Sequence, residues 1–444
     1  MDLSGTPSAP STVPGHKPQL LRSMGRMTLT ALALNSMLGN GIFGLPSLVA
    51  SKLGAASICA VLAAALINGI FLACFSELAS RFSEAGGPYL YARVALGRFA
   101  GIQVGWFLWL TRLSAAAASA NLFVAYLAEF WTPAGSTGMR IAVLTLFLGF
   151  LASINIIGVG AGAKLSNVFT VAKLVPLTIF IAAGLLYVVE VHPHSSFSPS
   201  GSLTANWLDG LFLLFFAYGG FDAALIPMSE AKNPRKDAPL ALFSALAVLT
   251  LIFALVQLIV VRVLNDPAAT DRPLATAAHQ FLGAGGAALM VAGAMISVYG
   301  HLTAYALHTP RLTFALAQSG DFPALFGKVN ARFRTPHASI LLFALAVWTL
   351  AVTGSYRLNA VLSVGSRLIV YGAACLAVMT LRRSDPDGAW FSVPGRDLIP
   401  VTGLLSCLLF FTRVGRWDLG IIAVVALVGV TNWMVVRSAL PQRL

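Results

Sequence analysis

The chain has 444 residues, of which 57% are hydrophobic and only 10% are charged, whereas soluble domains carry about 25% charged residues. Apolar stretches of about 20 residues recur along the whole length, and each can cross a hydrocarbon core about 30 Å thick as a helix. This composition excludes a soluble protein and predicts an all-α integral membrane protein. The net charge of +13 is distributed over loops between the apolar stretches, which argues against nucleic acid as a partner.

Twelve transmembrane helices are expected after a polar tail. Residues 1–25 hold Ser, Thr, Pro and Gly without an apolar run, and we expect a disordered cytoplasmic tail there. The expected spans cover residues 26–52, 54–80, 98–130, 140–160, 164–190, 205–230, 239–264, 285–315, 338–354, 358–381, 397–413 and 417–437.

The basic residues divide unevenly between the two sides of these spans. With the N-terminus inside, nineteen Lys and Arg residues lie in the tails and alternate loops of that side. The opposite side holds six: Arg140, Arg262, Arg272, Arg357, Arg413 and Arg416. This bias predicts that both termini are cytoplasmic. The short tails and compact loops favour a bacterial inner (plasma) membrane.

Two of the expected helices are interrupted at their centres. The first reads NSMLGNGIFGLPSL at residues 35–48, with three glycines and Pro46 in the middle, and the sixth reads FFAYGGFDAALIPMSEAKNP at 215–234, with Gly219, Gly220 and Pro227. Gly and Pro also serve ordinary kinks and close packing in membrane helices. Breaks at positions one and six together, however, indicate an inverted-repeat transporter with its site at the breaks.

The chemistry of an unwound turn explains why such breaks bind a ligand. Backbone N–H and C=O groups freed at the membrane midplane cannot be satisfied by lipid. The N–H groups at the start of a half-helix suit a carboxylate, and freed carbonyl groups suit an ammonium group or a cation. Two facing breaks therefore predict a receptor for the zwitterionic end of an amino acid.

Four segments resemble the amino acid/polyamine/organocation (APC) superfamily of permeases, in the order of that family, between about residue 25 and residue 437. They are GNGIFGLP (39–46), the segment beginning FSELASRFSEAGGPYLYA (75–106), FFAYGGFDAALIPMSEAKNPRKDAP (215–239) and the segment beginning PRLTFALAQSGDFPALFG (310–339). The resemblance implies the LeuT-type fold, in which two inverted five-helix repeats work by alternating access. Here the repeats would be residues 26–190 and 205–381, followed by helices 11 and 12 at 397–437.

The resemblance also implies the substrate contacts. The family's α-carboxylate contacts fall on Asn40 and Gly41, and its α-amino contacts fall on the carbonyl groups of Met37, Phe216 and Gly219. Ile42, next to Gly41, is also a candidate substrate-binding residue. Asn40 departs from the family, in which Ser or Ala is more usual. Phe216 falls where the family keeps an aromatic lid, so it would gate the site, and Tyr305 falls where another aromatic residue lines the eighth helix.

Ionisable residues inside the bilayer are functional candidates, because a charge at a helix centre costs about 2.5–3.5 kcal/mol on insertion scales. Lys173 matches a fifth-helix lysine of the family that stands where sodium-coupled relatives bind a cation, which disfavours sodium dependence. The alternative is a lysine that only braces neighbouring helices. Asp222 stands where many relatives have Glu, and pairing with Arg112 or Arg367 is an alternative to a role in proton coupling. His301 is a candidate proton relay or a hydrogen-bonded core histidine.

These observations together predict a secondary active transporter that couples uptake of neutral amino acids to protons. Arg112, Lys173 and Arg367 outnumber Asp222 near the midplane, so we expect neutral or acidic side chains to be preferred to cationic ones, with Arg112 setting selectivity. Two alternatives remain open, an amino acid exchanger and a polyamine or cationic amino acid permease, with a transporter-like sensor as a remote third.

An enzyme is not expected, because the sequence contains no HExxH, no GxSxG and no paired carboxylates at depth. The cysteines Cys59, Cys74, Cys375 and Cys407 lie in apolar segments with no paired spacing, so no metal site or disulfide is predicted. No cofactor is expected. The expected partners are a small amino acid, protons and the lipid bilayer.

Overall fold

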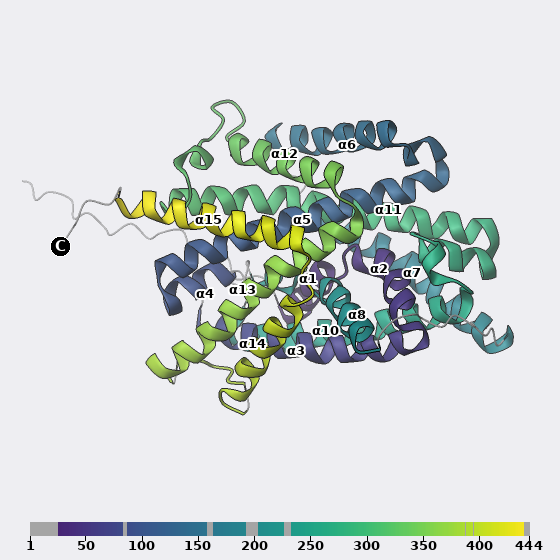
Figure 1. Cartoon of the computed structure of the whole chain (residues 1–444), viewed down its shortest axis with the longest axis horizontal. Coiled ribbons are helices and arrows are strands. Elements are labelled where there is room, and N and C mark those ends of the chain that lie inside the picture. The colour runs from purple at the N-terminus through teal and green to yellow at the C-terminus, as the bar shows by residue number, and fades with distance from the viewer. Residues whose placement is uncertain are drawn as a thin grey trace, which may run out of the picture.

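The computed structural model describes residues 25–82, 87–157, 163–191, 203–225, 232–386, 388–393 and 395–438. The expected tail lies almost wholly outside these residues, as does Pro227. Within the described residues every regular element is a helix (Figure 1).

Helices follow one another with short connections. The α-helices are α1 (Arg26–Met37), α2 (Gly41–Leu53), α3 (Ser57–Arg81), α4 (Gly87–Leu96), α5 (Arg98–Phe130), α6 (Thr137–Ile157), α7 (Ala163–Val191), α8 (Leu203–Ala217), α9 (Phe221–Ala224), α10 (Pro234–Val263), α11 (Pro273–Gln318), α12 (His337–Thr353), α13 (Tyr356–Ser384), α14 (Leu398–Phe411) and α15 (Arg416–Ser438). Short 3₁₀ turns are η1 (Gly54–Ala56), η2 (Thr132–Gly135), η4 (Pro267–Ala269) and η5 (Ala324–Gly327).

The two expected interruptions are present. The first expected span is divided into α1 and α2, and the sixth into α8 and α9.

Two other helical stretches were not expected from the sequence. The short helix α4 fills the stretch between the second and third spans, and α11 begins well before residue 285 because a helix at 273–282 joins it through a kink at Gly283 (φ 65°, ψ −159°).

Eight helical segments of the described residues are long and apolar enough to cross a membrane, judged by length and composition. They are Gly41–Arg81, Arg98–Phe130, Thr137–Ile157, Ala172–Val191, Lys236–Val263, Pro273–Gln318, Tyr356–Ser384 and Arg416–Arg437. Two shorter apolar helices are α12 and α14. The count falls below the twelve spans expected from hydropathy because the breaks leave α1, α8 and α9 as short pieces, α2 and α3 count as one continuous segment, and α12 and α14 have fewer than 18 residues.

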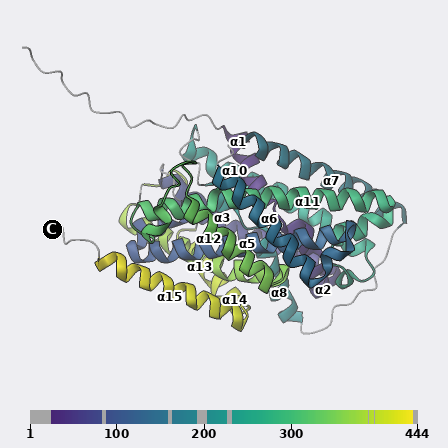
Figure 2. The ribbon, with the colours of Figure 1, turned by 90° about the horizontal axis from the view of Figure 1, so that it is seen from above.

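The buried centre of the molecule is built around α5 and α13. These two helices pack along each other, and within their most apolar windows 67% and 72% of residues are buried. By contrast, only 17% of the residues in the most apolar window of α15 are buried, and this helix lies on the outside of the bundle (Figures 1 and 2). The apolar surface of α15 is therefore available to lipid.

Most ion pairs of the described residues lie at one or the other end of the bundle. On the side that the sequence analysis assigns to the cytoplasm, Arg26 pairs with Asp237 at 3.2 Å and Arg382 with Glu77 at 2.5 Å. Buried Asp321 pairs there with both Arg93 at 3.1 Å and Arg98 at 2.7 Å. On the other side the pairs are Arg272 with Glu129, and Arg413 and Lys52 with Asp209.

The Asp321 cluster ties α4 and α5 to the end of α11. Tyr89 of α4 donates a hydrogen bond to the Asp321 carboxylate, and Asn432 of α15 donates to the Asp321 carbonyl oxygen at 2.6 Å. Burial, followed by the hydrogen bond to Asp321, raises the pKa of the Tyr89 phenol. The phenol therefore stays a donor to the carboxylate at any physiological pH.

Candidate functional site

The first break lies between Met37 and Gly41. The N–H of Leu38 closes the last turn of α1 onto the Leu34 carbonyl oxygen at 2.7 Å, and the Gly39 N–H donates to the Met37 carbonyl oxygen at 2.8 Å. The helix resumes at Gly41, whose N–H and that of Ile42 have no acceptor within α2, because the first N–H groups of a helix lack one. The start of α2 thus presents backbone donors at the centre of the chain's first apolar segment.

The second break lies between Ala217 and Phe221. Gly220 adopts φ +102°, a backbone conformation that L side chains rarely take, and a Cβ there would also lie 2.6 Å from the Ser36 carbonyl oxygen. The position therefore requires glycine. At this turn the Phe216 carbonyl oxygen accepts from the Gly219 N–H at 3.2 Å, and the carbonyl oxygens of Phe215 and Phe216 each lie 3.4 Å from Arg367 Nη1.

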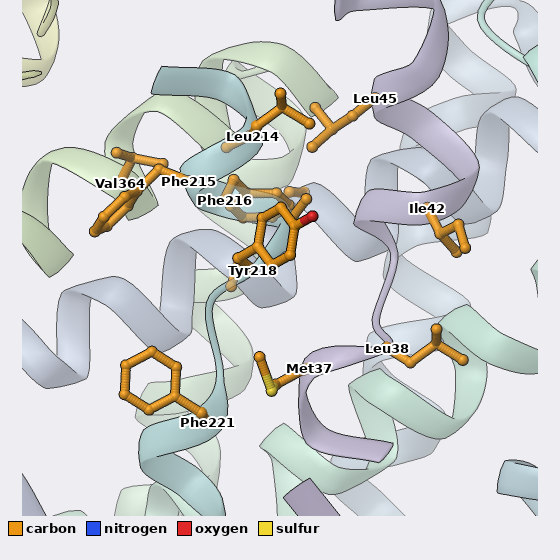
Figure 3. Close-up of a cluster of buried hydrophobic side chains, with 14 of the residues drawn as sticks. Met37, Leu38, Ile42, Leu45, Leu214, Phe215, Phe216, Tyr218, Phe221 and Val364 are labelled. Atoms are coloured by element: carbon orange, nitrogen blue, oxygen red, sulfur yellow. The ribbon is translucent and has the colours of Figure 1, made fainter. Parts of the chain in front are cut away.

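The two breaks face each other (Figure 3). The ribbon of the first break, between Leu38 and Ile42, runs beside that of the second, between Tyr218 and Phe221, with Met37 lying between them. The Cα of Gly41 is so close to Ala217 that an added Cβ would lie 2.9 Å from the Ala217 Cα. Glycine at residue 41 therefore allows the close approach of α2 to α8.

A small cavity lies between the breaks. Its volume is about 10 Å³, which is enough to hold about one water molecule. Its described lining is Ser36, Met37, Gly39, Asn40, Gly41, Ala115, Phe216, Ala217, Gly219, His301, Tyr305 and Arg367. Most residues predicted to contact substrate are therefore gathered here from α1, α2, α8 and α11. Ile42, Lys173, Asp222 and Arg112 are buried nearby but do not belong to this lining.

Asn40 uses its side-chain amide within the protein. Its Nδ2 donates to Ser119 Oγ of α5 at 2.7 Å, and Ser119 in turn donates to the Ala115 carbonyl oxygen. This contact fixes the start of α2 against α5. Asn40, which stands where the APC superfamily more usually has Ser or Ala, thus has a hydrogen-bond partner that the sequence did not identify.

Lys173 of α7 binds the first break. Its ammonium group donates to the carbonyl oxygen of Leu38 at 2.6 Å and to that of Asn35 at 3.0 Å. The side chain is 4% exposed, and no carboxylate of the described residues lies within 4.0 Å of it. The Lys173 amine therefore contacts the carbonyl groups at the end of the interrupted helix.

Asp222 pairs with Arg112, one of the two partners considered from the sequence. Their carboxylate and guanidinium are 3.9 Å apart, and both side chains are buried. Tyr371 of α13 lies 3.5 Å from the same carboxylate. The contact joins α9, just after the second break, to the long helix α5.

Aromatic and imidazole rings form one wall of the cavity. His301 and Tyr305, one turn apart on α11, meet edge to face with ring centroids 4.6 Å apart. Phe216 lies across the cavity on α8, where it contacts Tyr356 and the Arg367 guanidinium. His301 thus stands beside the first break, close to Gly39, where a Cβ would lie 2.8 Å from its ring.

Arg367 lines the cavity, although the sequence placed it only among the charges near the midplane and not among the substrate contacts. Its depth in the tenth expected span was evident from the sequence, but helical spacing could not say which neighbours it would meet. Ser36 and Ala115 were also not predicted, and nothing in the sequence distinguishes them from other small residues of membrane helices. Among the residues the structure describes, no group of three His, Cys, Asp or Glu side chains is placed to hold a metal ion.

Comparison with known proteins identifies the family. Residues 24–436 match the amino acid permease family, so the chain belongs to that family of the APC superfamily, whose members are membrane transporters. It is a multi-pass membrane protein.

Three relatives illustrate the range of the family. The methylthioribose transporter of Bacillus subtilis is 29% identical, with 88% of each chain covered. The branched-chain amino acid permease BcaP of the same organism is 26% identical, with 89% of each covered, and its serine/threonine exchanger SteT is 26% identical, with 87% of this chain and 89% of SteT covered.

Proposed function

We propose that this protein is a secondary active transporter that moves amino acids across the membrane by alternating access around the cavity between the two breaks. The observation that carries the proposal is the facing of the two breaks, with the α2 N-terminus on one side and the carbonyl groups of Phe215 and Phe216, at the end of α8, on the other. This arrangement suits a carboxylate and an ammonium group at once.

Each end of the amino acid has a proposed partner. The carboxylate is assigned to the N–H groups of Gly41 and Ile42 beside Asn40, and the ammonium to the carbonyl groups of Met37, Phe216 and Gly219. Phe216 and Tyr305 would close over the side chain. The cavity is too small for this cargo as it stands, so the breaks must separate when substrate enters.

The proposed architecture has twelve spans in the LeuT-type arrangement, with repeats at 26–190 and 205–381 and two further helices at 397–437. The positions of the breaks at the first and sixth spans support this division. We place both termini in the cytoplasm, on the strength of the positive-inside bias and of ion pairs that do not mix residues from the two sides.

Proton coupling without sodium is proposed from Lys173. Its ammonium group holds the freed carbonyl groups that would otherwise attract a metal cation. Asp222 and His301 lie close enough to the cavity to take part in proton movement, although Asp222 is also the partner of Arg112. A cavity lined by Arg367, with Lys173 and Arg112 buried nearby, favours a neutral or acidic cargo over a cationic one or a polyamine.

Amino acid exchange is the second candidate, because SteT is named a serine/threonine exchanger, and the same site serves either mode. The names of SteT and BcaP also support neutral cargo.

Counterflow with the purified protein in liposomes tests the proposal. Vesicles preloaded with one amino acid should take up the radiolabelled form of it, with and without a pH gradient. Absence of counterflow for every amino acid in a panel covering neutral, acidic and basic side chains would refute the proposed function. Uptake that needs an internal amino acid and ignores the pH gradient would select exchange over proton coupling.

A further inference from the structure

Arg367 is the charged side chain that lines the cavity directly. It comes from α13, is 4% exposed, and lies against Gly219 at the second break. Burying a guanidinium is costly unless hydrogen bonds and an opposite charge compensate for the lost water. The hydrogen bonds and counter-charges around Arg367 therefore show whether its buried charge is compensated within the protein.

The hydrogen bonds of Arg367 are incomplete. Its Nη1 reaches the carbonyl oxygens of Phe215 and Phe216 at 3.4 Å each, at the outer limit for a hydrogen bond. Its Nε is buried and has no hydrogen-bond partner among the described residues, and its guanidinium stands 5.9 Å from the centre of the Phe216 ring. A guanidinium offers five donors in a rigid fork, so most of its capacity is unused.

No protein carboxylate balances this charge within the described residues. Asp222, the acid nearest the breaks in the described ion pairs, is 3.9 Å from Arg112. No described carboxylate lies within 4.0 Å of Arg367. The other basic side chain near the breaks, Lys173, is bound by backbone carbonyl groups and brings no carboxylate with it. The site thus carries a positive charge that a bound anion would neutralise.

The position of Arg367 indicates that the anion it would bind is not the α-carboxylate of an amino acid. The N-terminus of α2, with Gly41 and Ile42, lies at the first break, whereas Arg367 lies at the second, beside Phe216 and Gly219. An amino acid that spans the cavity would place its α-carboxylate at the first and its side chain towards α13. The weak contacts with Phe215 and Phe216 cost little to release when the fork turns to a new acceptor.

We propose that Arg367 binds a carboxylate in the cargo's side chain, so that the preferred cargo is an acidic amino acid. This inference rests on the proposed function and narrows its neutral or acidic cargo to the acidic class. When the guanidinium turns to the side-chain carboxylate, the Phe216 carbonyl oxygen keeps the Gly219 N–H, and its second lone pair becomes available to the cargo's ammonium group.

The test compares L-glutamate with L-glutamine, which has nearly the same size and shape but no charge. Purified wild-type protein in liposomes should take up labelled glutamate by counterflow, and unlabelled glutamate should compete at least about tenfold better than glutamine or leucine. Glutamate should also raise the melting temperature of the protein more than glutamine at equal concentration. Glutamine or leucine competing as well as glutamate would overturn the inference.

Substitution of Arg367 assigns the preference to this residue. In Arg367→Gln, glutamate and glutamine should compete within about threefold of each other, whereas Arg367→Lys should keep part of the preference. Arg357→Gln, at an exposed position of the same helix, is the matched control and should behave as wild type. A retained preference in Arg367→Gln contradicts the assignment. If that variant does not fold, the wild-type comparison still decides.

The outcome also separates this inference from the proposed function. Counterflow of leucine or serine in preference to glutamate leaves the transporter standing and overturns only the role of Arg367. Absence of counterflow for all amino acids overturns both.

Discussion

The ammonium group of Lys173 lies 2.6 Å from the carbonyl oxygen of Leu38, the residue that follows the last residue of α1 at the first break. The lysine belongs to α7, so a residue far along the chain satisfies backbone groups that the break exposes. We propose that the amine at this place serves as an internal cation, so that its protonation and the backbone geometry of the break are linked.

Lys173→Ala should abolish the pH sensitivity of uptake, because the freed carbonyl groups of Asn35 and Leu38 would then have no ionisable partner. Replacement of sodium by choline should leave wild-type uptake unchanged. Uptake into liposomes over a range of external pH, in both salts, measures both effects. Val175→Ala, exposed on the same helix, is the control. A large loss of wild-type uptake in choline would show that sodium is required after all.

Gly41→Val should remove substrate binding while leaving the protein in the membrane. A side chain at residue 41 meets the Ala217 backbone at 2.9 Å, so α2 and α8 must separate and the backbone donors at the start of α2 move. Gly41→Ala should give a smaller loss. Gly149→Val makes a matched control, because nothing lies within 4 Å of an added Cβ there. Binding by the purified, monodisperse Gly41→Val protein at wild-type affinity would place the site elsewhere.

The buried pair of Arg112 and Asp222 is expected to stabilise the joint between α5 and α9. Asp222→Asn leaves a buried guanidinium without its counter-charge, and we expect a loss of about 3 kcal/mol, seen as a lower melting temperature in detergent. The double variant Arg112→Gln, Asp222→Asn should recover part of the loss, since neither charge then remains. Asp271→Asn in an exposed loop controls for loss of negative charge. Additive losses in the double variant would argue that the two residues do not interact.

Competition among amino acids tests the charge of the site without assuming a particular cargo. Arginine should inhibit uptake less than alanine, leucine or glutamate, because a cationic side chain would enter a region that already holds Lys173, Arg112 and Arg367. Arg112→Ala should weaken this discrimination if Arg112 sets selectivity. Stronger inhibition by arginine than by leucine in the wild type is the result that contradicts the charge argument.

Several features of this protein follow from the sequence alone, because they depend on local patterns. Apolar stretches separated by short polar loops define membrane helices, since lipid leaves the backbone no other way to satisfy its hydrogen bonds. Glycine and proline in the middle of the first and sixth stretches predict where those helices break, and the breaks are found between Met37 and Gly41 and between Ala217 and Phe221. The motifs around them also identify the amino acid permease family.

The tertiary structure decided which side chains meet at the breaks, because contacts between helices depend on the rotation and tilt of each helix, which hydropathy does not encode. Two buried arginines look equivalent in the sequence, yet Arg112 pairs with Asp222 whereas Arg367 lines the cavity without a carboxylate partner among the described residues. In the same way, Asn40 forms a hydrogen bond with Ser119, which is 79 positions away in the sequence. The sulfur atoms of Cys74 and Cys375 lie 3.9 Å apart, although the spacing of these cysteines did not indicate a pair. Such pairings arise only when helices far apart in the chain pack together.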